Sequence, residues 1–80
     1  MGTKTSEIIY TSYSLALDYD ATGNLIYFGR AEKGALQSAA VWAINRLDYD
    51  VNDNLISILW ADGNGSFDNV WNNRTVLSYN

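Results

Sequence analysis

The sequence predicts a small, mainly β (α+β) domain: an antiparallel sheet or sandwich made of two related β-hairpins, with one short helix near the C-terminus. Its 80 residues are enough for one domain, so we expect 1–80 to fold as a unit. A repeat occurs at a spacing of 30 residues: Leu17-Asp18-Tyr19-Asp20 recurs as Leu47-Asp48-Tyr49-Asp50, and Asn24-Leu25-Ile26 recurs as Asn54-Leu55-Ile56. Each copy has strand-forming residues on both sides of a short polar loop, which is typical of a hairpin. We therefore expect hairpins over 15–31 and 41–61.

The first hairpin turns at Asp20-Ala21-Thr22-Gly23. Aspartate at the first turn position can accept hydrogen bonds from the backbone ahead of it, and glycine can adopt a positive φ. A four-residue loop would align three pairs, namely Tyr19 with Asn24, Leu17 with Ile26, and Leu15 with Phe28. Because these pairs form one apolar face, we expect that face to be the covered side of the sheet.

The second hairpin turns at Asp50-Val51-Asn52-Asp53, where Asp53 takes the place of the glycine. Aspartate tolerates the left-handed conformation better than most residues do. The following strand, 55–60, is apolar on both faces. It is therefore either a central strand covered on both sides, which we favour, or a strand exposed at an oligomer interface. The preceding segment, 41–49, is alanine-rich and also compatible with helix, but the repeat favours a strand.

A turn at Asp62-Gly63-Asn64-Gly65 precedes the C-terminal elements. The spacing of Phe67, Val70, Trp71 and Arg74 predicts a two-turn helix over about 66–74, with Ser66 as its N-cap. Residues 75–79 then predict a last strand, and 7–10 are candidates for a first strand.

Composition excludes several functional classes. The chain has no cysteine and no histidine, so it lacks the commonest transition-metal ligand and the usual general base. Its formal charge is −4 and its five basic residues are scattered, which disfavours nucleic-acid binding. No apolar stretch is long enough for a membrane span, and 1–7 lack the apolar core of a signal peptide. We therefore expect a soluble chain with no catalytic residues, no cofactor, and no nucleic-acid or membrane partner.

Calcium is the one ion for which the sequence offers candidate ligands. Asp50 and Asn52, and likewise Asp62 and Asn64, alternate as oxygen donors do in calcium loops. The second pair fails as an EF-hand, because Phe67 stands where glycine is required and Asn73 where a bidentate glutamate is required. We favour the interpretation that these residues only form turns.

Aromatic residues are numerous for so small a core: 3 Trp, 6 Tyr and 2 Phe. Rings at the surface often mark a contact with a sugar or another protein. We take Tyr27, Tyr49 and Trp42 as candidates for such a surface contact, and expect Trp60 and Trp71 to lie in the core or at a subunit interface.

Two resemblances to known families extend these expectations. The run from Tyr19 to Ile26 resembles the YD-repeat hairpin of large toxin-shell proteins. A wider pattern resembles small uncharacterised proteins of tailed phages found in aquatic viral sequences; it comprises Tyr19-Asp20, Gly23-Asn24, Gly29, Ala31, Gly34, Ser38, Trp42, Ile44, Tyr49-Asp50, Asn54, Trp60-Ala61-Asp62-Gly63, Phe67, Trp71 and Arg74. Asp53 departs from it, since that pattern usually has glycine there.

The wider resemblance implies a non-enzymatic structural or accessory protein of the virion. Such a protein would act through protein–protein contacts, as a homo-oligomer or with other virion proteins. It implies no catalytic or ligand-binding residues. Outside a virion, the expected location is the cytoplasm. The alternative function is a small carbohydrate- or calcium-binding module that uses the tyrosines and the Asp/Asn turns.

Overall fold

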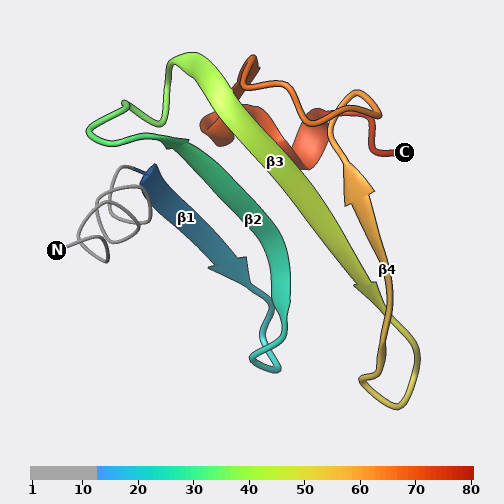
Figure 1. The fold of residues 1–80 in the computed structure, drawn as a ribbon. Coiled ribbons are helices and arrows are strands. Elements are labelled where there is room, and N and C mark those ends of the chain that lie inside the picture. Colours follow the sequence, from blue (N-terminus) through green and yellow to red (C-terminus); the bar gives the residue numbers. More distant parts are fainter. Residues whose placement is uncertain (1–12) are drawn as a thin grey trace, which may run out of the picture.

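Four strands form an antiparallel meander in the computed structural model, which describes residues 13–80 (Figure 1). The strands follow one another in the sheet in chain order: β1 (Tyr13–Tyr19), β2 (Leu25–Glu32), β3 (Ala40–Tyr49) and β4 (Leu55–Trp60). A two-residue strand, β5 (Asn69–Val70), pairs with the start of β3 and leads into a 3-10 helix, η1 (Trp71–Val76). The mainly β prediction is confirmed. The candidate first strand at 7–10 lies outside the described residues.

The two hairpin turns have the same hydrogen-bond pattern. Asp20 N donates to Asn24 O over 2.9 Å, and Asp50 N donates to Asn54 O over 2.9 Å. One carboxylate oxygen, Oδ1, of each aspartate also accepts from two backbone N–H groups, two and four residues ahead. Asp53 has a φ of 63°, where Gly23 has 91°, so aspartate adopts the left-handed conformation as predicted. The repeat in sequence is thus a repeat in structure.

The observed register differs from the expected one. Leu17 pairs with Phe28 rather than Ile26, and Leu15 pairs with Arg30. Asp20 itself pairs with Asn24 across the turn, and an irregularity between Asp18 and Tyr19 then leaves one extra residue on β2. The second hairpin has the same irregularity between Asp48 and Tyr49. Leu15, Leu17 and Phe28 still share one face of the sheet, because the partners of the two leucines on β2 differ from the expected ones by two residues, an even number.

The C-terminal segment covers one face of the sheet, which we call the inner face; it bears Ala16, Gly29 and Ile44. Trp71 is 4% exposed and packs against this face, with its ring centroid 6.0 Å from that of Trp42. The remaining buried members of this core are Ala16, Ala31, Ile44 and Ala61. Small residues on the strands make room for the two indoles, so the core consists of large rings packed on small side chains.

The C-terminal segment is also tied to the sheet by polar contacts. Arg74 Nε donates to Asp18 Oδ2 of β1 over 2.9 Å, and its guanidinium lies 4.6 Å from the Trp71 ring centroid. The Tyr79 hydroxyl donates to Arg74 O over 2.7 Å, and its ring lies 5.8 Å from that of Tyr27. These contacts join the last residues of the chain to the first described strand.

The short helix near the C-terminus is confirmed, but its predicted bounds of 66–74 and the strand predicted over 75–79 are wrong. The helix is a 3-10 helix that begins at Trp71, after extended residues that pair with β3. Ser66 does not cap it; its N–H donates to Asn64 Oδ1 within the preceding turn. Thr75 and Val76 belong to η1, and pairing near the end of the chain is limited to a bridge between Tyr79 and Ala61. The spacing of Phe67 and Trp71 does not mark one face of a helix, because the two residues pack on opposite faces of the sheet.

The favoured position of β4 is also wrong. β4 lies at one end of the strand order, and β1 lies at the other. Among the residues of β4, only Trp60, the last one, forms backbone hydrogen bonds with Asn80. Ile56 and Ile58 are 63% and 53% exposed, so this apolar strand is an exposed edge rather than a covered centre. No helix within residues 13–80 is long and apolar enough to cross a membrane.

Candidate functional site

The second face of the sheet, which we call the outer face, is apolar, and its side chains on the edge strands β1 and β4 are exposed. Along one row across the sheet, Leu17 pairs with Phe28, Phe28 with Asn45, and Asn45 with Trp60. Paired residues point to the same side, and the next residues on that side are two positions away. The outer face therefore also bears Leu15, Leu47 and Ile58, the last two forming a cross-strand pair. Leu15, Leu17 and Ile58 are 60%, 49% and 53% exposed.

This exposure reverses the expectation that the face of Leu15 and Leu17 is the covered one. The C-terminal segment packs on the inner face, where Gly29 leaves space for Trp71. Bulky leucines on the outer face have no corresponding layer among the described residues. We call Leu15, Leu17, Phe28, Leu47 and Ile58 the apolar patch. Monomeric proteins seldom expose large contiguous apolar surfaces, so a patch of this kind usually marks an interaction site.

Phe67, from the loop after β4, covers the outer face only near one end of β2. The Arg30 guanidinium lies between two rings there, 5.6 Å from the centroid of Trp60 and 5.7 Å from that of Phe67. Phe67 also stacks with Tyr13, with a centroid distance of 6.1 Å and an interplanar angle of 16°. This row of rings and one guanidinium borders the apolar patch, which continues uncovered toward the hairpin turns.

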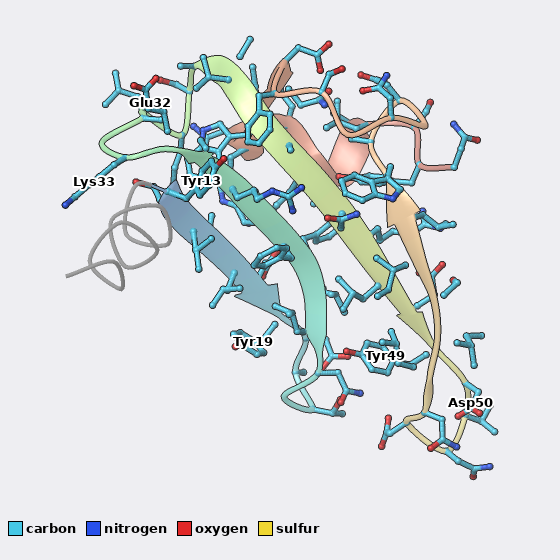
Figure 2. The ribbon with its side chains drawn as sticks, in the orientation of Figure 1. Tyr13, Tyr19, Glu32, Lys33, Tyr49 and Asp50 are labelled. Carbon is cyan, nitrogen blue, oxygen red and sulfur yellow. The ribbon has the colours of Figure 1, made fainter. Side chains whose placement is uncertain are left out.

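A pocket of about 360 Å³ lies at the same end, lined by Tyr13, Glu32, Val41 and Phe67. Figure 2 shows Tyr13 and Glu32 close together at this end, whereas Tyr19, Tyr49 and Asp50 lie toward the hairpin turns. Tyr13 and Phe67 are 46% and 42% exposed. Two accessible rings beside a carboxylate can stack on the apolar side of a sugar ring while the carboxylate accepts its hydroxyl hydrogens.

The four calcium candidates are not brought together. Asp50 and Asn52 belong to the turn before β4, whereas Asp62 and Asn64 follow β4 at its other end. Asp50 Oδ1 already accepts from Asn52 N over 2.9 Å and Asn54 N over 3.0 Å. Asn64 Oδ1 accepts from Ser66 N, and Asp62 has a positive φ of 60°. These hydrogen bonds and the left-handed backbone at Asp62 belong to turns. Residues 13–80 contain no cluster of three or more acidic side chains that could hold a metal ion.

None of the three aromatic candidates for surface contact is freely exposed. Trp42 is 2% exposed and its Nε1 donates to Leu36 O, so it belongs to the core and provides no surface contact. Tyr27 does lie on the face opposite Leu17, but that is the covered face, and it packs half-buried against Tyr79. Tyr49 is half-buried and its hydroxyl donates to Leu25 O of the neighbouring hairpin over 2.8 Å. The two half-buried tyrosines thus contribute to packing between parts of the fold.

The apolar patch was not predicted as a site, although most of its residues stand out in the sequence. The alternation of Leu15, Leu17 and Phe28 indicated one apolar face but not whether another layer covers it. One signal was present: the C-terminal aromatic residues are too few to cover both faces of four strands.

Comparison of the chain with protein-family models, with curated proteins and with solved structures finds no match.

Proposed function

We propose that the chain is a non-enzymatic structural or accessory protein of a phage particle, and that it acts by binding protein surfaces through the apolar patch. The observation that carries the proposal is the exposure of Leu15, Leu17 and Ile58, which lie on the two edge strands of the outer face, beyond the part that Phe67 covers. The resemblance to small tailed-phage proteins supports the virion as the setting.

Energetics favour a partner that covers the whole patch. Full burial of a Leu or Ile side chain contributes about 1.5–3 kcal/mol, so the three half-exposed side chains contribute about 3 kcal/mol together. Association costs at least about 4 kcal/mol in lost translational and rotational freedom. The partner must therefore also bury the remaining exposed surface of Phe28 and Leu47, which are partly buried on the two central strands.

The proposal is tested by looking for the protein in assembled particles. Purified virions would be analysed by mass spectrometry, and a residue-specific cross-linker would be used on intact particles. We expect the chain in stoichiometric amount, cross-linked near the apolar patch. Detection only in the lysate and never in particles would contradict the proposal.

A small carbohydrate-binding module is the second candidate, and the pocket beside Tyr13 and Phe67 favours it. A glycan array probed with the purified chain would test this function. Tyr13→Ala would remove one ring of the stacked pair, whereas Tyr19→Ala, 55% exposed in the wild type and at the turn end of β1, is a matched control. Binding lost with the first variant and kept with the second would support the carbohydrate module over the structural protein.

A further inference from the structure

We infer that the partner of the apolar patch is a second copy of this chain, packed face to face about a two-fold axis. This inference rests on the proposed function, since it names the partner for the same surface. In such a dimer the patch is self-complementary, because each leucine or isoleucine meets another apolar side chain. The result is a two-layer sheet in which both outer faces become the interior.

Charge distribution supports a second copy. Among the strand residues of the outer face, the charged ones are Arg30 and Glu32, which offset each other. Asp18 and Asp48 point to the inner face, where they form ion pairs with Arg74 and Arg46. The other described acidic residues lie in the turns and in the loop after β4: Asp20, Asp50, Asp53, Asp62 and Asp68. The chain has a net charge of −4, yet face-to-face packing brings no like-charged strand residues into the centre of the interface.

The absence of charged side chains in the apolar patch also favours a second copy over a different protein. A surface that binds a different protein of opposite charge carries complementary charges, which steer association. The apolar patch contains none, since all five of its members are Leu, Ile or Phe. The two hairpin turns hold Asp20, Asp50 and Asp53 and no basic residue, so a second copy approaching turn to turn would be repelled.

The area of the face limits how tightly two copies can bind. Four strands spaced about 4.8 Å apart, with six to ten residues at about 3.3 Å each, present a face of about 450 Å² in projection, one end of which Phe67 already covers. Two such faces bury at most about 900 Å², which is below the usual range of specific, stable interfaces. The dimer should therefore be weak and dissociate on dilution.

The dimer is tested by sedimentation velocity and light scattering on the full chain from about 1 µM to about 1 mM. Leu17→Lys and Ile58→Lys each place a cation in the patch, on opposite edge strands. Val51→Lys is the matched control: it makes the same charge change at a residue that is 98% exposed on the second turn, away from the patch. All three variants reduce the net negative charge equally, so general repulsion cannot explain a difference. Circular dichroism would establish that each variant is folded.

We expect the wild type and Val51→Lys to dimerise with similar constants, and Leu17→Lys and Ile58→Lys to weaken dimerisation about tenfold or more. Because the patch is uncharged, salt should change the constant by no more than about twofold. A wild type that is monomeric up to about 1 mM, or patch variants that dimerise as the wild type does, would overturn the inference. If that monomeric chain were still found cross-linked through the patch in virions, the proposed function would stand with another virion protein as partner.

Discussion

The indole ring of Trp71 lies directly against the backbone of Gly29: a Cβ atom at position 29 would lie 2.6 Å from Cε3 and 2.8 Å from Cζ3 of that ring. The third close atom would be Cε3 of Trp42, at 3.2 Å. Gly29 is therefore the point on β2 against which both buried indoles pack. Its missing side chain allows the C-terminal segment to pack on the inner face rather than the outer one.

Gly29→Ala should destabilise the fold by about 1–3 kcal/mol, the usual cost of overpacking a tight core. In a domain of this size that corresponds to a loss of about 5–20 °C in melting temperature. Gly65→Ala is the control, because a Cβ there would lie at an ordinary 3.5 Å from the Trp60 ring. Thermal melts by circular dichroism compare the two. Equal melting temperatures would mean that Trp71 does not pack on Gly29.

Trp71→Ala should cost about 3–5 kcal/mol, since it deletes a large buried ring. Stabilities of small domains begin at about 5 kcal/mol, so the variant should be close to unfolded at room temperature. Val76→Ala, in the same 3-10 helix but 80% exposed, should change little. Urea denaturation would measure both. A Trp71→Ala protein as stable as the Val76→Ala protein would place the indole at the surface.

The turns were predictable because their chemistry is local. Asp20 and Asp50 bond to backbone groups within four residues, so the spacing of the repeat contains all the information needed. The left-handed conformation of Asp53 follows from its correspondence with Gly23 in the other copy.

The covered face was not predictable in the same way. Hydrophobicity favours the side of Leu15 and Leu17, which is exposed, over the side of Ala16 and Gly29, which is covered. Small residues occupy the inner face because Trp71 needs room, and that requirement depends on a partner more than 40 residues away in sequence. Local alternation reports the two faces of a strand but not which one the rest of the chain covers.

Stability at high pH should depend on Tyr79. Burial, and to a lesser degree the nearby Tyr27, raises the pKa of the Tyr79 hydroxyl to about 12, while Arg46 and Arg74 act in the opposite direction. Since the unfolded value is about 10, the unfolded state loses this proton first. The contribution of Tyr79 is thus fully present below about pH 10 and is lost as the pH rises toward about 12.

Melting temperatures measured across that range would test the effect. Tyr79→Phe cannot ionise, so its melting temperature should fall less steeply than that of the wild type. The variant should start from a lower value at neutral pH, because the hydrogen bond from the hydroxyl to Arg74 O is lost. If the melting temperatures of the two proteins fell in parallel as the pH rises, the Tyr79 hydroxyl would have the same pKa in the folded and unfolded states.

Stability at low pH should depend on the turn aspartates. Hydrogen bonds from the Asn24 backbone and the Thr22 side chain lower the pKa of Asp20, and those from the backbones of Asn54 and Asn52 lower that of Asp50. Their contribution is present above the unfolded value near 4 and is lost as the pH falls through the lowered folded values. The double variant Asp20→Asn, Asp50→Asn should lose less melting temperature than the wild type between about pH 6 and about pH 2. Identical losses would contradict this role.

Calcium should leave the melting temperature unchanged if these aspartates only form turns. A site with a dissociation constant of about 10 µM would, at about 1 mM free ion, stabilise the native state by about 2.7 kcal/mol. For this length of chain that means a rise of about 10–20 °C. The expected difference in melting temperature between calcium and chelator is too small to measure, because Asp50 Oδ1 already accepts two backbone N–H hydrogen bonds and the Asp62 turn lies at the other end of β4.

Thermal denaturation of Asp50→Ala and Asp62→Ala completes the experiment. Each variant should be destabilised by the same amount with and without the ion. A large rise in the wild type that either substitution abolishes would instead assign the Asp/Asn turns to a calcium-binding module.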